Sequence, residues 1–401
     1  MKRASRAELT VLVIAFNARP IALSAKRLGF RVLAADYWGD VDIQGRVDGL
    51  ASVIVQRPGT RPTRPKESVA ESLLRVASKL IADHGKPDIV LLGSGLDDRP
   101  DIWSRISRMA PILGNGAESL PRLRDRMRLF DLAEELNIRC PVTVETRDVE
   151  ECVEGAREIG FPIVLKPPAG SGGYYIELAK DEEQIRALYG ERRKMLLQEY
   201  VKGTDVSASV LGNGEECFVV TVNEQLIGRG DLGMTRPFGY CGNVVPLSVS
   251  RDIVAEIEEA SKTLGEALTL VGTNGIDWVV DRNGTPVLME INPRFQATLE
   301  CIEKVSGKNL VDLHLDACNG RLPDRLNPVG FATKMILYAT HRGVVGNLSK
   351  VEGICDVTRP GVIVEKEDPI CTVQKWEKTR IRSVYSAKRT VRRVRNLIHG
   401  A

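Results

Sequence analysis

Residues 274–294, which read NGIDWVVDRNGTPVLMEINPR, decide the fold and the kind of site that this chain is expected to have. Two apolar runs flank Asn283-Gly284, a dipeptide that favours a hairpin turn. Asp277 falls on the first predicted strand. Glu290 and Asn292 fall two residues apart on the second, so their side chains share one face. Oxygen ligands are those that Mg²⁺ prefers, so the segment predicts a magnesium-binding hairpin.

A simpler interpretation is that these polar side chains line the wet face of an ordinary hairpin. The carboxylates, however, lie inside the apolar strings DWVV, from Asp277, and VLMEI, around Glu290. Burying carboxylates without a cation is costly, which favours the metal interpretation.

A lysine and a glycine-rich loop precede the hairpin along the chain. The apolar string FPIVLK, residues 161–166, predicts a buried strand that ends at Lys166, and the loop that follows contains Gly170, Ser171, Gly172 and Gly173. Glycines let backbone N–H groups approach phosphate oxygens closely, and a lysine adds a positive charge beside them. Phosphate binding is the functional interpretation, and a flexible turn after a strand is the structural alternative.

A third motif, MLLQEYVKGTD at residues 195–205, predicts an apolar strand that runs into a short linker. Such a linker can offer backbone groups to the edge of an adenine, and Asp205 can accept hydrogen bonds from ribose hydroxyls. Taken alone, the motif is better explained as a strand with a solvated end.

The composition of the chain excludes several classes of protein. The 401 residues carry 56 Lys and Arg against 53 Asp and Glu, a net charge of +3, which lacks the strongly basic footprint of a dedicated nucleic-acid binder. No apolar run approaches the roughly 18–20 residues of a membrane span, and the N-terminal stretch 1–16 is better explained by a first buried strand than by a signal peptide. The eight cysteines form no CxxC pair, which predicts reduced thiols and a cytoplasmic protein.

The order of predicted elements suggests three domains. Residues 10–120 alternate strand and helix, which predicts a doubly wound parallel sheet over 1–119. The loop after its first strand, residues 17–20, lacks the GxGxxG pattern, so we do not predict a dinucleotide-binding domain. We predict an α+β domain over 120–325, with a lid subdomain at about 140–200 and one charged helix at 122–137, and a β-rich domain over 326–401 that ends in a basic helix at 384–398.

Taken together, the three motifs resemble the ATP-grasp superfamily of D-alanine–D-alanine ligase and biotin carboxylase. The thirteen-residue interval from Asp277 to Glu290 and the string Glu290-x-Asn292-Pro293-Arg294 are the most specific marks. Asp125-Arg126 resembles the start of the family's entry helix, with Arg126 where the family usually has a lysine. The flanking regions resemble those of biotin carboxylase-related ligases.

The resemblance implies a role for each motif. Members of the family bind ATP with Mg²⁺ or Mn²⁺, activate a carboxylate as an acylphosphate and join it to an amine. It implies that Asp277, Glu290 and Asn292 hold the metal and that Arg294, with Lys166, stabilises phosphoryl transfer. The remaining nucleotide-binding positions that it implies are Arg126, Lys166, Gly170, Ser171, Gly172, Gly173, Gln198, Glu199, Val201 and Asp205.

The substrates are expected to be a small carboxylate and a small amine, with neither nucleic acid nor membrane as partner, and related ligases are often homodimers. Candidates for seating the substrate are Arg229, Arg236 and Asn243, which lie between the nucleotide and metal motifs, and Gly95, which follows a parallel strand. Each arginine is equally well explained as a solvated loop charge. The run 375–395 holds nine Lys or Arg and one Glu, which indicates a solvated helix face or a contact with an anionic partner.

Two other functions share the same nucleotide and metal residues. The first is biotin carboxylase-like chemistry, with bicarbonate as the activated acid, although the chain has no biotin-carrier segment. The second is a catalytically silent ATP-binding regulator, for which the loss of a metal ligand or of Arg294 would be the sign, and neither is lost.

Overall fold

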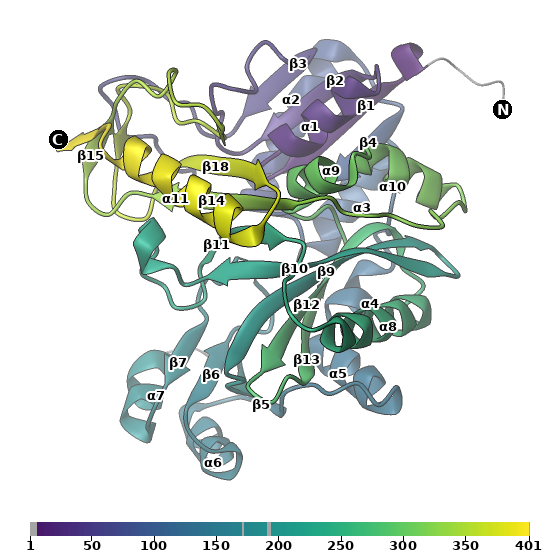
Figure 1. The fold of residues 1–401 in the computed structure, drawn as a ribbon, viewed down its shortest axis with the longest axis vertical. Helices are drawn as coiled ribbons and strands as arrows, with labels where there is room; N and C mark the ends of the chain where they lie inside the picture. The colour runs from purple at the N-terminus through teal and green to yellow at the C-terminus, as the bar shows by residue number, and fades with distance from the viewer. Residues whose placement is uncertain (1–5, 171, 191–193, 401) are drawn as a thin grey trace.

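The computed structural model describes residues 6–170, 172–190 and 194–400, and the strands of these residues form four sheets (Figure 1). Ser171, one of the predicted loop residues, lies outside the described residues.

The N-terminal sheet is parallel and has the order β3-β2-β1-β4. Val11 and Val13 of β1 pack on the side of helix α1, while Leu12 and Ile14 pack on the side of α2 and α3. Because both faces are covered, the strand reads as a continuous apolar run. The elements are β1 (Thr10–Ala15), α1 (Arg19–Arg27), β2 (Arg31–Asp36), β3 (Gly49–Ser52), α2 (Val69–His84), β4 (Ile89–Leu92) and α3 (Pro100–Met109), after the short 3₁₀ turn η1 (Arg6–Glu8).

The largest sheet has eight strands in the order β13-β12-β9-β10-β11-β14-β18-β16, and its neighbours pair antiparallel. Helix α8 packs against β9 and β10, and α9 and α10 lie between this sheet and α1. Strands that follow residue 326 therefore extend the same sheet as the metal hairpin. The elements are β9 (Gly203–Asn213), β10 (Cys217–Ile227), η2 (Gly230–Leu232), β11 (Tyr240–Val245), α8 (Arg251–Ala267), β12 (Val271–Asp281), β13 (Pro286–Asn292), α9 (Leu299–Ser306), α10 (Leu310–Cys318), β14 (Phe331–Tyr338), β16 (Ile354–Cys355) and β18 (Pro369–Glu377).

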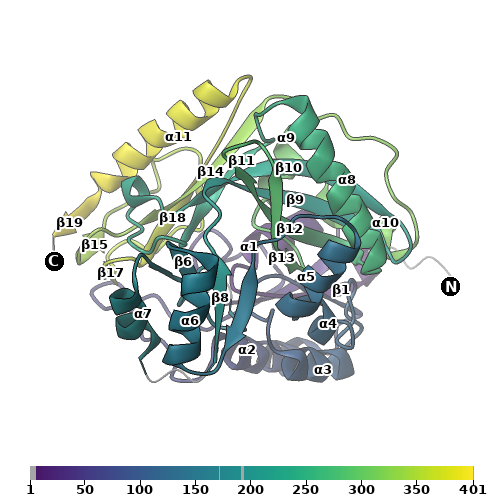
Figure 2. The same cartoon turned by 90° about the horizontal axis from the view of Figure 1, so that it is seen from below.

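A smaller sheet, β5-β8-β6-β7, projects from the rest of the molecule, and we call residues 143–199 the lid. Figure 2 shows α6 and α7 on its outer side. Ile163 and Leu165 pack against these helices, while the alternate residues Val164 and Lys166 line a cavity on the opposite face. The elements are β5 (Thr143–Thr146), α6 (Val149–Ile159), β6 (Ile163–Lys166), β7 (Glu177–Ala179), α7 (Glu182–Tyr189) and β8 (Met195–Glu199).

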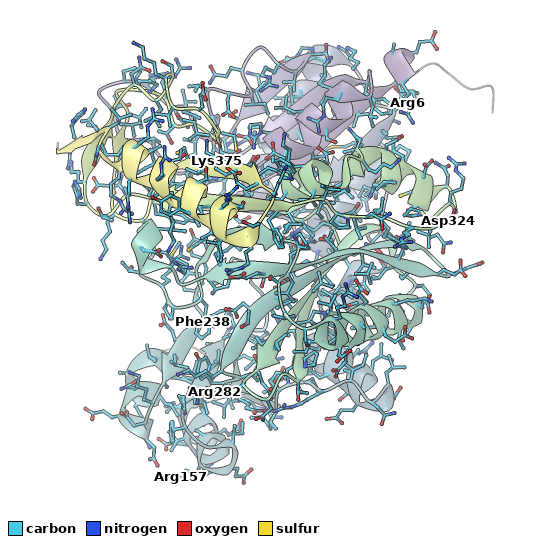
Figure 3. All side chains as sticks on the ribbon, in the orientation of Figure 1. Arg6, Arg157, Phe238, Arg282, Asp324 and Lys375 are labelled. Atoms are coloured by element: carbon cyan, nitrogen blue, oxygen red, sulfur yellow. The ribbon has the colours of Figure 1, made fainter. Side chains whose placement is uncertain are left out.

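The C-terminal part adds a three-stranded sheet and a long helix. The sheet has the order β17-β15-β19, with β15 (Gly343–Val345), β17 (Ile363–Val364) and β19 (Ile398–Gly400). Helix α11 (Arg380–Arg395) packs on β14 and β18, and in Figure 3 it lies across the front of the molecule near Lys375. Ala387, Val391 and Val394 form its buried face, so its basic side chains are left at the surface.

The prediction of one helix over 122–137 was wrong. The structure has two helices, α4 (Leu120–Arg124) and α5 (Arg126–Glu135). Asp125, with ψ of 101°, leaves the helical conformation and caps α5 by accepting hydrogen bonds from the backbone N–H groups of Met127 and Arg128, each at 3.2 Å. The break turns both Arg124 and Arg126 toward the interior, where they are buried.

Other predictions were confirmed. Asn283-Gly284 lies in the turn between β12 and β13, and the eight cysteines are all free. The predicted basic helix is present, but its bounds of 384–398 were wrong: it spans Arg380–Arg395, because Thr379 caps its start and Ile398 begins β19. None of the helices in the described ranges combines the length and the apolar character that a membrane crossing needs. The predicted domain boundaries stay predictions.

Candidate active site

The hairpin of β12 and β13 brings the three predicted metal ligands together. Asp277 lies opposite Glu290 in the strand register, and a bulge after Asp277 changes which side chains of β13 face outward. The Asn292 side-chain N–H₂ donates to Asp277 Oδ2 at 2.8 Å and to Glu290 Oε1 at 3.3 Å. The amide thus bridges two carboxylates that would otherwise repel each other.

The two carboxylates differ in their ionisation. Burial, together with the charge of Glu290, raises the pKa of Asp277, although Gln225 donates to its Oδ1 at 3.0 Å. Burial also acts to raise the pKa of Glu290, but the charges of Arg126 and Arg124 outweigh it and hold that pKa below its usual range. One buried carboxyl therefore favours the neutral form and the other the anion.

This donor set fits a magnesium ion that is shared with a nucleotide. Mg²⁺ is commonly held by one or two carboxylates, with phosphate and water oxygens as its other ligands. Asp277 and Glu290 meet this requirement, and the Asn292 oxygen, which here accepts from Arg294, would join them after a rotation of its amide. The described residues contain no group of three or more His, Cys, Asp or Glu arranged to hold a metal by themselves. A cation here would also offset the mutual repulsion that raises the pKa of Asp277.

Two arginines from the break between α4 and α5 surround the hairpin. Arg126 donates from Nη2 to Glu290 Oε2 at 3.0 Å. Arg124 donates from Nε to Asp98 Oδ1 at 2.8 Å and from Nη1 to the carbonyl of Ile291 at 2.9 Å. Both side chains are at most 7% exposed, so positive charge is concentrated beside the hairpin, where the phosphates of a nucleotide are expected. We call this part of the cavity the phosphate end.

Lys166 lies at the end of β6, where the lid faces the hairpin. Its Nζ donates to Gln198 Oε1 at 3.0 Å, and the Gln198 N–H₂ donates in turn to Thr143 Oγ1 at 2.8 Å. Burial, followed by the charge of Arg126, lowers the pKa of Lys166 to about 7. Gln198 therefore positions Lys166, and it lines the same cavity with one N–H and one oxygen lone pair still unused.

The glycine-rich loop is held at both ends. The Gly170 N–H donates to Asp98 Oδ2 at 2.6 Å, and the Gly170 carbonyl accepts from Arg124 Nη2 at 3.1 Å. Gly173 has φ of +72°, and a Cβ there would lie 1.9 Å from the carbonyl oxygen of Phe238. Phe238, labelled in Figure 3, belongs to the loop between η2 and β11, so this contact requires glycine at position 173.

The linker after β8 forms the predicted nucleoside end. Glu199, Val201 and Asp205 line the same cavity as Lys166 and Glu290. Burial raises the pKa of Asp205 to about 6, and no other described side chain donates a hydrogen bond to it. Its carboxylate is thus free to accept hydroxyl groups.

Arg294 is held in place by the N-terminal sheet. Its Nε donates to Asp97 Oδ1 at 2.6 Å, and its Nη2 donates to Asn292 Oδ1 at 3.3 Å. Although burial opposes it, the charge of Arg294 keeps the pKa of Asp97 below its usual range. The turn after β4 therefore fixes the arginine next to the metal hairpin.

One cavity of about 880 Å³ contains most of the predicted site. Its walls include the predicted substrate residues Gly95, Arg236 and Asn243. Arg236 lies over the ring of Tyr174 at 3.9 Å from its centroid, so it also contacts the lid loop. Arg229 is not part of the wall, because its guanidinium forms a two-point ion pair with Asp231 at 2.9 and 2.8 Å.

Sequence reasoning missed the contributions of Arg124, Asp97, Asp98 and Gln225. Arg124 belongs to the segment 122–137, which was predicted as one charged helix in which only Arg126 had a role in the site. Asp97 and Asp98 lie in the turn after β4, which was predicted to contact the substrate with Gly95 as its candidate residue. The paired acidic residues at the end of a parallel strand were the available signal, since ligands bind at such edges.

Comparison with known proteins agrees with this geometry. Residues 123–298 match the ATP-grasp domain family. Residues 123–298 are therefore similar to ATP-grasp domains. The chain is 28% identical over 381 residues to an uncharacterized protein of Methanocaldococcus jannaschii, covering 94% of this chain and 91% of that protein.

More distant relatives have named functions. The chain is 24% identical over 278 residues to the carbamoyl phosphate synthase large chain of Clostridium acetobutylicum, with 67% of this chain matched to 25% of that one. It thus spans only about a quarter of that relative's length.

Solved structures share the fold. Biotin carboxylase of Campylobacter jejuni superposes with a TM-score of 0.75 at 15% identity, over 98% of this chain and 92% of that one. An ADP complex of N5-carboxyaminoimidazole ribonucleotide synthetase superposes with a TM-score of 0.70 at 16% identity, over 95% of each chain.

Proposed function

We propose that this protein is an ATP-dependent ligase that activates a carboxylate as an acylphosphate, releases ADP and joins the acyl group to an amine. The observation that carries the proposal is that Lys166, Arg294 and the hairpin pair Asp277 and Glu290 line one cavity. That cavity is larger than the metal and phosphate groups need and continues past them toward the N-terminal sheet.

The residues of this chain divide the chemistry between them. Asp277, Glu290 and Asn292 hold Mg²⁺, which supplies charge neutralisation at the phosphates when bound. Asp205 accepts the ribose hydroxyls, and the linker that contains Glu199 and Val201 lies along the adenine.

The cations act on the charge that develops during transfer. The substrate carboxylate oxygen attacks the γ-phosphorus, and the bond from that phosphorus to the ADP oxygen breaks. Lys166 and Arg294 face the oxygens that carry the spreading negative charge. Because Asp97 and Gln198 already orient these two side chains, little reorganisation is needed when the charge appears.

The second half of the reaction forms the new bond. The amine nitrogen attacks the acyl carbon, loses a proton and expels phosphate. Closure of the lid, with Gly170 and Gly173 at its contact points, keeps water from the acylphosphate. Positioning the amine against it can supply on the order of 7–11 kcal/mol of the barrier.

A screen for ADP release tests the proposal. The purified chain is given Mg·ATP with pairs drawn from panels of carboxylic acids and primary amines, and the Lys166→Ala variant serves as the inactive control. We expect ADP to form only when an acid and an amine are both present. ADP release that bicarbonate stimulates without an amine would contradict the proposal and favour a bicarbonate-activating enzyme.

A further inference from the structure

The cavity extends from the β12–β13 hairpin to a second end, which we call the far end. The N-terminal and C-terminal parts of the protein form its walls. Asp40 and Trp38, which follow β2, line it from one side, and Asp356 and Lys334 line it from the other. The proposed phosphoryl transfer uses none of these four residues.

Carboxylates outnumber cations around this end. Arg19 is shared among three of them: its Nε lies 2.6 Å from Asp356 and 3.3 Å from Asp42, and its Nη atoms donate to Glu300 at 2.7 Å. Lys334, which is 2% exposed, donates to the carbonyl of Ala297 at 3.2 Å. Five acidic side chains stand against these two cations: Asp36, Asp40, Asp42, Glu300 and Asp356.

Asp40 is the one of these carboxylates that faces the cavity without an ion pair among the described residues. It is 7% exposed, and its Oδ1 accepts a hydrogen bond from Gln56 Nε2 at 3.0 Å. Within the same described ranges, no donor reaches its Oδ2. A buried carboxylate in this state is costly unless a ligand supplies the missing charge.

Aromatic rings stand beside Asp40 in the cavity wall. Phe16 stacks on Tyr37 with ring centroids 4.8 Å apart, and Trp38 meets each ring edge-on at 5.3 Å. The guanidinium of Arg64 lies 5.8 Å from the Trp38 ring and is paired with Asp368. The Trp38 ring thus already accommodates a cation, and an aromatic wall that also contains a carboxyl group suits a positively charged nitrogen on an apolar body.

The nature of the ligand follows from these groups. An anion would be repelled by the surplus carboxylates. A bare metal ion is disfavoured, because the described acidic residues offer no group of three arranged as ligands. Burial, followed by the charge of Asp36, raises the pKa of Asp40 well above its usual range, so the unligated carboxylate costs stability as the pH rises.

We propose that Asp40, with the wall of Phe16, Tyr37 and Trp38, binds a positively charged nitrogen of the amine substrate. This inference rests on the proposed function, because it names the recognition element of its second substrate. Asp40 is a binding residue here, and Asp356, which is neutralised by Arg19, shapes the opposite wall.

Calorimetric titration of the full chain with Mg·ADP present tests the inference. The probes are benzylamine, protonated at neutral pH, and benzyl alcohol, which has a similar ring and no charge. We expect benzylamine to bind at least about tenfold more tightly, as a charge-assisted contact implies. Asp40→Asn is expected to abolish that preference, while Asp83→Asn, an exposed change on α2, leaves it intact.

Two further measurements keep the outcome decisive. Burial raises the pKa of Asp40, so the ligand-free side chain favours the neutral form that Asn resembles, and the Asp40→Asn variant should melt no lower than the native chain. A purely structural carboxylate would lower the melting temperature. The Trp38→Leu variant keeps Asp40 but loses the aromatic ring, and it should bind benzylamine roughly threefold more weakly. Equal binding of the two probes by the native chain would overturn the inference even if Asp40→Asn failed to fold.

The same titrations separate this inference from the proposed function. Glu290→Gln is expected to lose ADP release and to keep its affinity for benzylamine. If no acid and amine pair releases ADP while benzylamine still binds through Asp40, the ligase proposal fails and the cation site stands. If ADP release requires an amine and Asp40→Asn leaves the KM for that amine unchanged, the cation site is wrong and the ligase proposal stands.

Discussion

The two ends of the cavity handle buried charge in opposite ways. At the metal hairpin, Asp277 and Glu290 face Arg126, Lys166 and Arg294, so the chain supplies its own counter-charges. At the far end, Asp40 has no such partner among the described residues. The first arrangement is ready for a polyanion that brings a metal ion, and the second for a cation. Charge balance within a fold thus indicates the sign of each ligand.

The largest expected effect comes from the metal end. Glu290→Gln keeps the shape of the side chain but removes the charge that faces Arg126 and the metal. We expect ADP release to fall by roughly 100- to 1,000-fold, the scale for losing a group that stabilises transferring charge. Steady-state ADP assays at saturating Mg·ATP measure it.

A matched control is Glu256→Gln on the exposed face of α8, which should retain native turnover. Native turnover in Glu290→Gln itself would show that the hairpin does not hold the catalytic metal. The proposed difference in ligand charge between the two ends of the cavity would then be wrong.

His314 is a buried titratable group outside both ends of the cavity, and its partners are hydrogen-bonding backbone groups rather than charges. His314 accepts from the backbone N–H of Thr273 at Nδ1, 2.8 Å away, and its Nε2 lies 3.2 Å from the carbonyl of Leu113. Burial lowers its pKa to about 4. The folded state therefore excludes a proton that the unfolded state binds near pH 6.5.

The sign of the resulting pH dependence follows. Above pH 6.5 His314 does not reduce the free energy of unfolding. As the pH falls from about 6.5 to about 4, the unfolded state binds a proton that the folded state excludes, and the free energy of unfolding decreases by about 3 kcal/mol in total. Urea unfolding at several pH values measures this. The His314→Asn variant should show a smaller change of the free energy of unfolding with pH in that window. An unchanged pH dependence would show that other groups cause it.

Positioning at the metal end gives a smaller effect. Asp97→Asn removes the charge that holds Arg294 at 2.6 Å, so we expect kcat to fall by about 10- to 100-fold. The KM for ATP should stay close to native, because Asp97 does not line the cavity. Asp101→Asn on the surface of α3 is the control. A raised KM with native kcat would mean that Asp97 acts through nucleotide binding.

The smallest effect distinguishes two arginines from the same stretch of chain. Arg236 lines the cavity and contacts Tyr174 of the lid, whereas Arg229 is paired with Asp231. We expect Arg236→Ala to reduce kcat/KM for the acid by about tenfold, and Arg229→Ala to change it by less than about twofold. Equal losses in the two variants would show that the cavity wall has been placed wrongly.

Much of the fold and of the phosphate end could be predicted from the sequence because the evidence there is local. The hairpin follows from Asn283-Gly284 between apolar runs, and its polar face follows from the spacing of Glu290 and Asn292. The prediction of one helix through Asp125 failed because a single side chain capped α5 and broke the pattern. Arg229 and Arg236 look alike in the sequence and are both ion-paired in the structure, but only Arg236 lines the cavity.

The sequence by itself determined the β12–β13 hairpin and the grouping of its polar side chains, since strand alternation and turn residues act between near neighbours in the chain. Only the tertiary structure decided which charges are paired. Asp97 meets Arg294 across 197 positions, and Arg19 meets Asp356 across 337. Such pairings depend on how separate sheets pack against each other. No local sequence pattern therefore predicts that Asp40 has no ion-pair partner among the described residues.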